Sequence, residues 1–362
     1  METLLLVIGI LVFLIVVHEL GHFVAAKIAR VKVEEFGIGY PPRAFTFGKF
    51  RGTEYTLNWI PFGGFVRLFG DVGEGQHGAG SLVDANRAVQ ALILVAGVSM
   101  NVLAAWGLYA GALHEGVPRA VEAPVAGEIA QLMISSVVPG SPADAAGLAA
   151  GDEILGLEDE DTLLATLTPE AFSDFVRAHP GEPITLTYLH AGEQKTTDII
   201  PAHAVVPDEA GRAALGVGVV LVSARPLPWG EAVVEAFGAT KKTFVTVLRG
   251  LGSIARRALA GLPAFSEVVG PIGLVGVVGD AAENGVGSVL ALAAFISVNL
   301  AVINLIPIPA LDGGRLVLLG VEATLRRSAP KLALQALNAF GFALIIVLMI
   351  TVTFNDISRL LT

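Results

Sequence analysis

Residues 18–22 read His18-Glu19-Leu20-Gly21-His22, and they lie inside an apolar run from Leu4 to Ala26 that holds no other charged residue. An ionisable group at bilayer depth costs about 2.5–3.5 kcal/mol on insertion scales. That cost is tolerated where the groups have partners, and two histidines four residues apart on a helix can share one metal ion. The segment therefore predicts a membrane helix that carries a metal centre.

The composition supports a membrane protein. The 362 residues are 54% hydrophobic and only 15% charged, whereas soluble domains carry more charge. The net charge of -10 argues against a nucleic-acid partner. The chain has no cysteine, so any metal must be bound by His, Asp or Glu side chains. The first apolar stretch lacks a basic leader and contains the His-Glu motif, so we expect a retained helix instead of a cleaved signal peptide.

Four apolar stretches are long enough to cross about 30 Å of hydrocarbon. They are Leu4–Ala26, Ala88–Leu113, Val289–Leu311 and Leu332–Phe354. Basic residues follow the first stretch and lie between the third and fourth, which places both loops inside the cell. These residues are Lys27, Arg30, Lys32, Arg315, Arg326, Arg327 and Lys331. The N-terminus, the long central region and the C-terminus are then outside.

The segments between the spans differ in character. Residues 31–70 alternate like strands, and Pro61-Phe62-Gly63-Gly64 marks a turn. Residues 120–225 are rich in Pro, Gly and acids and predict a small α+β domain. Residues 229–262 predict a basic amphipathic helix, which suits either a membrane surface or ordinary solvent exposure.

The fold class expected is thus a four-helix membrane protein with a membrane-associated β segment and an inserted α+β domain. The expected divisions are helix 1 at 1–30, the β segment and loop at 31–87, helix 2 at 88–115, the inserted domain at 120–205, a surface-helix region at 206–287, helix 3 at 288–314 and helix 4 at 330–356.

A catalytic zinc ion uses three protein ligands and keeps a fourth position open. Asp312 directly follows the third span, at the same depth as His18 and His22, so it is the predicted third ligand. A helix cap beside Arg315 is the alternative role for Asp312. Glu19 is rotated by about 100° from His18 around the helix, so it can act as general base toward water on the metal.

The sequence before Asp312 cannot form a regular helix. Asn304-Leu305-Ile306-Pro307-Ile308-Pro309 contains two prolines, which remove backbone donors and clash with the preceding turn. Irregular backbone at membrane depth is tolerated where it lines protein or a wet cavity. Asn304 can therefore bind substrate backbone or join two helices, and Asn101 of the second span has the same two alternatives.

These motifs together resemble the site-2 protease family of intramembrane zinc metalloproteases, in its bacterial branch with extracytoplasmic PDZ domains, the regulator of sigma-E protease type. HELGH matches the family's HExxH, and residues 304–314 match NxxPxPxLDGG. The further matches are Gly97 and Asn101 to GxxxN, Gly52–Tyr55 and Ile60–Val66 to the β-hairpin segment, and Pro139–Ala143 with Gly147-Leu148 and Gly151-Asp152 to a PDZ domain.

The resemblance implies one Zn²⁺ per chain, bound by His18, His22 and Asp312, with Glu19 activating the water. It also implies a set of residues that hold substrate, namely Asn304, Pro307, Pro309, Asn101, Gly63 and Gly64. The β segment would pair with an unwound substrate strand. Substrates would be single-span membrane proteins, such as an anti-sigma factor or signal-peptide remnants.

The same resemblance implies a place in the cell. The protein would cross the bacterial inner membrane several times and contact its lipids, with the PDZ domain outside the cytoplasm and the active site toward the cytoplasmic side. The PDZ domain would bind a peptide or a protein terminus.

Two other functions are compatible with the same residues. A non-catalytic membrane scaffold would use the PDZ domain to hold partners, with a structural metal site; structural zinc sites are usually closed by four protein ligands, and the sequence supplies three. A transporter would use His and Asp for ion coupling, but the four spans contain no inverted repeat.

Overall fold

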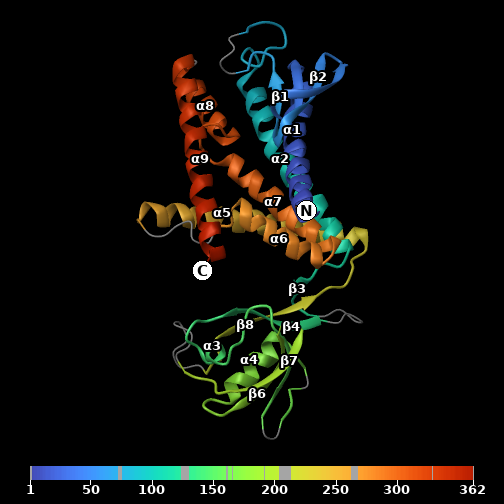
Figure 1. The fold of residues 1–362 in the computed structure, drawn as a ribbon, viewed down its shortest axis with the longest axis vertical. Coiled ribbons are helices and arrows are strands. Elements are labelled where there is room, and N and C mark those ends of the chain that lie inside the picture. The colour runs from blue at the N-terminus through green and yellow to red at the C-terminus, as the bar shows by residue number, and fades with distance from the viewer. Residues whose placement is uncertain are drawn as a thin grey trace. The chain divides into compact units, whose positions relative to one another are not determined.

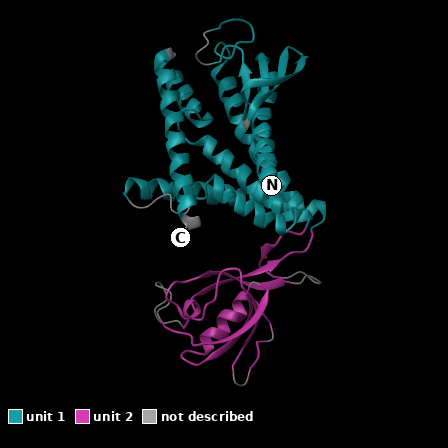
Figure 2. Ribbon diagram, viewed as in Figure 1, with its two compact units in different colours: residues 1–115, 227–362 teal, residues 116–226 magenta. Residues whose placement is uncertain are grey.

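The computed structural model describes residues 2–71, 76–123, 130–159, 162–164, 166–190, 192–203, 213–261, 268–327 and 329–361. The chain divides into two compact units (Figure 2). Unit 1 comprises residues 1–115 and 227–362, and unit 2 comprises residues 116–226. We describe each unit by itself.

The described part of unit 1 contains seven helices and two long strands (Figure 1). The elements are α1 (Glu2–Ile28), β1 (Val33–Phe50), β2 (Thr53–Leu68), α2 (Arg87–His114), α5 (Trp229–Leu259), α6 (Pro271–Glu283), α7 (Val286–Leu305), α8 (Asp312–Leu325) and α9 (Lys331–Leu361). Four of these helices, α1, α2, α7 and most of α9, are long and apolar enough to cross a membrane. The predicted four-span fold class is confirmed.

Helices α2 and α7 pack together through small residues. Ala105 of α2 and Ala294 and Ala301 of α7 are fully buried, and small side chains let helix backbones approach closely in a membrane. Helix α5 runs across the spans at the end where the chain's N-terminus lies (Figure 1). Its Val247 packs against α2 and α7, so the predicted amphipathic helix has one face inside unit 1.

The third predicted span, 288–314, is divided between two helices, as the two prolines before Asp312 predict. Helix α7 ends at Leu305, and α8 begins at Asp312. Pro307 and Pro309 account for the break, since proline cannot continue the helical hydrogen bonding. Gly313 and Gly314 lie against the backbone of Leu305 and Ile308, where a methyl group would overlap the carbonyl oxygens. These glycines allow α8 to start directly beside the broken segment.

Strands β1 and β2 are bent and form four antiparallel segments. Residues 33–38 of β1 lie between two parts of β2, because Glu35 pairs with both Glu54 and Arg67. Residues 43–50 pair with residues 53–58. The order across the sheet is therefore 43–50, 53–58, 33–38 and 64–68. Within the described residues, segment 64–68 has a strand on one side only, so no strand pairs with its other backbone edge.

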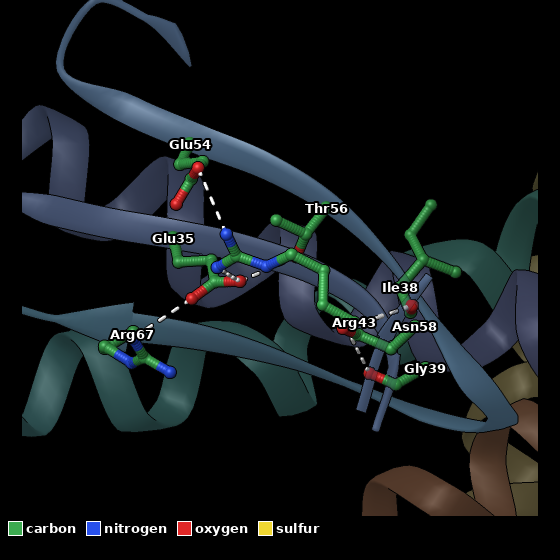
Figure 3. Close-up of polar contacts among 8 residues, drawn as sticks. All are labelled: Glu35, Ile38, Gly39, Arg43, Glu54, Thr56, Asn58 and Arg67. Atoms are coloured by element: carbon green, nitrogen blue, oxygen red, sulfur yellow. Dashed lines mark hydrogen bonds and ion pairs between the residues drawn. The ribbon is translucent and has the colours of Figure 1, made fainter. Parts of the chain in front are cut away.

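A buried carboxylate connects these four segments (Figure 3). Glu35 accepts hydrogen bonds from Arg43 Nη2 at 2.8 Å and from Thr56 Oγ1 at 2.8 Å, and it pairs with Arg67 Nη1 at 3.1 Å. Arg43 also donates to Glu54 at 3.2 Å. The charge of Glu35 is thus paired and hydrogen-bonded, which burial of a carboxylate requires. Each segment contributes at least one member to the network.

Helix α9 contacts the rest of unit 1 at a few points along its length. Gly341 lies against the carbonyl group of Pro309, with no room for a side chain between them. Near the other end, the buried carboxylate of Asp356 accepts hydrogen bonds from the N–H groups of Gly270 and Gly273 at 3.0 and 2.9 Å. Asp356 therefore caps the N-terminus of α6, which has no cap from its own segment.

Unit 2 contains a six-stranded antiparallel sheet and two helices within its described residues. The strand order is β3-β8-β4-β5-β6-β7. The elements are β3 (Arg119–Val121), β4 (Ala130–Val137), α3 (Pro142–Ala145), β5 (Glu153–Glu158), α4 (Pro169–Ala178), β6 (Ile184–His190), β7 (Glu193–Ile199) and β8 (Val217–Ser223).

The core of unit 2 forms between the sheet and α4. Thr168 caps α4 by accepting from the N–H of Ala171, and the helix buries Phe172 and Phe175 against the sheet. The expected domain at 120–205 is shorter than the compact unit at 116–226. The difference arises because β8, which comes late in sequence, pairs between β3 and β4 and completes the sheet.

Candidate metal centre

The two histidines of the HELGH motif face the same point. Both lie on α1 one turn apart, and their Nε2 atoms are 3.2 Å apart. Their side chains are almost fully buried, with about 11% exposed. Gly21, between them in sequence, lies against the backbone of Ala96, so α1 meets α2 closely at this height.

Asp312 completes a triangle with these histidines. It is the first residue of α8, and its Oδ2 lies 3.1 Å from Nε2 of His18 and 3.2 Å from Nε2 of His22. Ligands of tetrahedral zinc at 2.0–2.1 Å from the metal lie about 3.3 Å from each other. The three atoms therefore have the spacing of three corners of a zinc tetrahedron. Within the described residues, this is the one cluster of three potential metal ligands.

The hydrogen bonding around the triangle favours a cation. His22 Nδ1 lies 2.8 Å from the carbonyl oxygen of Ile93 and donates to it, so the Nε2 of a neutral His22 carries a lone pair. That lone pair faces Asp312 Oδ2, which is buried and has no hydrogen-bond partner. Two electron-rich atoms at this distance repel each other unless a positive ion lies between them. The donor set of two imidazoles and one carboxylate suits zinc.

Glu19 lies beside the triangle, on the same helix. A methyl group on Gly64 would be 3.2 Å from Glu19 Cγ, and the backbone N–H of Val66 faces the Glu19 carboxylate. The sheet segment 64–68 thus lies directly along the acid. Tyr40 lines the same cavity as Glu19, and burial and then the Glu19 carboxylate raise the pKa of its phenol. Glu19 therefore lies beside both the triangle and the edge of segment 64–68 that pairs with no strand.

A cavity of about 460 Å³ opens onto these residues. Four of the residues predicted to hold substrate line it, namely Asn101, Asn304, Gly63 and Gly64. Pro307 and Pro309 are not among the residues that line it. Their neighbours Ala310 and Leu311 are, because the prolines turn the chain and leave the following residues at the wall.

The structure adds residues that the sequence did not single out. Ile93 contributes only its backbone carbonyl, for which a sequence carries no signal. Tyr40 stands in Gly39-Tyr40-Pro41, where the chain turns between two strand segments. The wall of the cavity also contains Arg315 and Asp71, which form an ion pair, and Glu322, which pairs with Arg87. These pairs attach α8 to the end of β2 and to the start of α2, which holds Asp312 toward the histidines.

Comparison with known proteins gives matches along nearly the whole chain. A model of the family described as "Peptidase family M50" matches residues 6–348. A protein of Clostridium perfringens whose name includes the words zinc metalloprotease is 33% identical over 346 residues, which are 95% of this chain and 95% of that protein.

Two further relatives are named zinc metalloprotease RasP. The one from Geobacillus kaustophilus is 27% identical and covers 99% of this chain and 97% of its own length. The one from Shouchella clausii is 28% identical and covers 99% of this chain and 100% of its own length.

Proposed function

Because the chain belongs to peptidase family M50 and is a site-2-type zinc metalloprotease of the membrane, we propose that it cleaves peptide bonds within the transmembrane segments of single-span membrane proteins. The observation that supports this most strongly is the triangle of His18, His22 and Asp312, whose ligand atoms lie 3.1–3.2 Å apart within a membrane-spanning unit. These three residues would bind one zinc ion per chain.

Zinc, when bound, supplies an activated water and polarises the carbonyl group of the bond to be cleaved. Glu19 is the residue of this chain placed to move the proton. Its carboxylate lies beside the triangle and would accept the proton from the attacking water and donate it to the departing amine. The contacts with Gly64 and Val66 hold Glu19 next to the position where a substrate would lie.

The edge of segment 64–68 that has no strand partner among the described residues supports a way to present the substrate. A helical peptide bond is shielded by its own hydrogen bonds, so it must unwind before it can be attacked. An unwound segment can add to a free sheet edge through backbone hydrogen bonds. Gly63 and Gly64 lie at the start of this edge, and Asn304 lies in the wall of the same cavity, where its side chain would bind the substrate backbone.

We place the protein in the bacterial inner membrane, with the metal centre toward the cytoplasm and unit 2 outside. The basic residues after α1 and around the end of α8 support this orientation. Unit 2 would act as a PDZ domain that binds a peptide or a protein terminus. An anti-sigma factor or a signal-peptide remnant is the kind of substrate that fits.

The orientation has a direct test, because the chain contains no cysteine. Lys49→Cys in β1 and Gln194→Cys in β7 each give a chain with a single thiol on an exposed residue. A membrane-impermeant maleimide should label Gln194→Cys in intact cells whose outer membrane has been removed. Lys49→Cys should react only after the inner membrane is opened; the reverse pattern would invert the proposed topology.

The catalytic proposal is tested with Glu19→Gln in the full-length chain, reconstituted in vesicles with a single-span substrate. We expect cleavage to fall by at least about 100-fold, in line with general-base removal, while bound zinc stays near one per chain. Glu2→Gln, on the same helix and exposed, is the matched control and should cleave normally. Asp312→Ala should lose zinc. Undiminished cleavage by Glu19→Gln would refute the assigned base and favour a scaffold with a structural metal.

A further inference from the structure

Helix α2 presents three successive turns to the two imidazoles. Ile93, Gly97 and Asn101 are spaced by four residues and therefore lie along one face of α2. Ile93 offers its carbonyl oxygen to Nδ1 of His22 at 2.8 Å. Gly97 leaves room for both rings. Asn101 brings its side-chain amide to 3.4 Å from Nδ1 of His18, measured from Nδ2.

Asn101 is fully buried, and a hydrogen bond from α7 holds its main chain in place. Its main-chain oxygen accepts a hydrogen bond of 2.8 Å from Ser297 Oγ on α7. The contact with α7 is thus made by the backbone, which leaves the side chain free to face α1. The Oδ1 atom of Asn101 has no hydrogen-bond partner in the described structure. A buried acceptor without a donor points to a group that is completed in another state of the site.

A metal ion bound to Nε2 of His18 would create such a state, because it changes which ring nitrogen carries the proton. A neutral imidazole carries one proton, so a histidine that binds metal through Nε2 carries its proton on Nδ1. Nδ1 then donates and needs an acceptor. The amide Nδ2 cannot accept, but a half-turn about the Cβ–Cγ bond brings Oδ1 to the same place and gives the unpaired oxygen its donor.

We propose that Asn101 is the positioning residue of His18, accepting the Nδ1–H of that imidazole through Oδ1 and so directing Nε2 at the zinc ion. The inference rests on the proposed function, since it needs zinc at the triangle. It assigns to Asn101 the task that the Ile93 carbonyl has for His22. Partners of this kind hold the orientation and the proton position of metal-binding imidazoles.

This role differs from the two predicted for Asn101, which were a contact with substrate and a contact between two helices. A residue that joined α2 to α7 would use its side chain for the contact, whereas here the backbone makes it. A residue that bound substrate would expose polar atoms to the cavity, whereas Asn101, although it is among the residues around the cavity, has 0% of its surface exposed. Its amide nitrogen instead lies 3.4 Å from Nδ1 of His18, a proposed zinc ligand.

The test compares three variants of the full-length chain in detergent. Asn101→Leu keeps the approximate volume and removes the acceptor. Asn101→Asp keeps the acceptor at the same length. Ser297→Ala is the matched control, because it removes the hydrogen bond to the Asn101 backbone without touching an imidazole. Zinc affinity is measured by competition with a chelator, and Co²⁺ is substituted to record the visible spectrum of the site.

We expect Asn101→Leu to bind zinc about 10–100-fold more weakly and to shift the Co²⁺ spectrum. Asn101→Asp and Ser297→Ala should stay within about threefold of the parent chain, with the Co²⁺ bands of a site that keeps all three ligands. Equal affinity and an unchanged spectrum in a folded Asn101→Leu would overturn the inference. If that variant does not fold, loss of zinc from Asn101→Asp would overturn it.

The outcomes also separate this inference from the proposed function. A parent chain that binds no zinc refutes the proposed metal centre. If the parent chain binds zinc and needs Glu19 for cleavage, but its zinc affinity does not change when residue 101 is substituted, only the role of Asn101 is refuted.

Discussion

Gly97 of α2 lies directly against the imidazole of His22. A methyl group on this glycine would overlap Nε2 of His22 and would come within 2.9 Å of Cε1 of His18. On the side that faces α2, the imidazole rings therefore pack directly against the helix backbone, because residue 97 has no side chain. Any substituent there must displace the rings, because the opposing atoms belong to side chains held by Ile93 and Asp312.

Gly97→Ala should consequently weaken zinc binding by at least about tenfold and reduce cleavage in parallel. Gly107→Ala is the matched control on the same helix, where a methyl group meets no atom within 4 Å. Since alanine is favoured over glycine in helix interiors by roughly 0.5–1 kcal/mol, that variant should be as stable as the parent chain or more stable. Chelator competition measures the zinc affinity, and thermal unfolding in detergent measures the stability. Similar zinc affinity in the two variants would contradict the packing argument.

A second pair of glycines tests how α8 positions Asp312. A methyl group on Gly314 would overlap the carbonyl oxygen of Ile308, whereas one on Gly320 meets nothing within 4 Å. We expect Gly314→Ala to lose about 1–3 kcal/mol of stability, as overpacked sites do, and to release zinc because α8 must shift. Gly320→Ala should retain the stability and the zinc content of the parent chain. Zinc content after gel filtration, with a melting curve for each variant, decides between these outcomes.

The network around Glu35 predicts unequal effects from two buried threonines. Thr56 donates to the Glu35 carboxylate at 2.8 Å, and Thr53 donates to the carbonyl oxygen of Val33 at the same distance. Hydrogen bonds to charged groups contribute about 1.5–3 kcal/mol, and those between neutral groups about 0.5–1.5 kcal/mol. Thr56→Val should therefore lower the melting temperature more than Thr53→Val. An equal or reversed order would show that the ionic character of the network contributes nothing to the sheet.

Unit 2 contains a histidine whose ionisation is linked to its stability. His179 donates through Nδ1 to the carbonyl oxygen of Phe175 at 2.8 Å, and its Nε2 lies 2.6 Å from Asp159. The hydrogen bond to Phe175 and then the pairing with Asp159 raise the pKa of His179 above its ordinary value, against the effect of burial. A pKa raised by folding adds stability below the unfolded pKa of about 6.5, and that gain is lost as the pH rises through the folded pKa.

The fragment 116–226, which has its own core, should therefore melt at a lower temperature as the pH rises from 6 to 8. His179→Gln keeps a hydrogen-bonding side chain but cannot ionise, so this part of the pH dependence should vanish. His203, an exposed histidine of the same unit, supplies the comparison variant His203→Gln. A pH dependence that persists undiminished in His179→Gln would assign the effect to another group.

The sequence predicted the elements of the membrane unit better than their connections. Leu4–Ala26 and the break at Pro307 and Pro309 could be read directly, because span length and proline chemistry are local properties. The order of the four sheet segments could not, because Glu35 pairs with residues at both ends of β2. Similarly, β8 joins its sheet between β3 and β4, and the alternation of its residues carries no record of those partners.

The candidate site shows the same division. His18 and His22 follow from helix geometry, and the depth of Asp312 predicted that it lies near them; in the structure its Oδ2 is 3.1 and 3.2 Å from their Nε2 atoms. Asn101 and Asn304 looked equivalent, since each is an amide within an apolar span. Only the packing of α2 against α1 distinguishes them, by turning Asn101 toward an imidazole. The contribution of Ile93 is a main-chain oxygen, which every residue possesses.

The sparse attachment of α9 has a consequence for how the membrane unit comes apart. Most of its described surface is uncovered by protein, and its fixed points include the approach of Gly341 to Pro309 and the cap that Asp356 places on α6. Local opening is easiest where few buried contacts must break. Amide protons of α9 should accordingly exchange with deuterium well before those of α1 and α2. Unit 1 would then begin to unfold at its last helix, while the three proposed zinc ligands stay together.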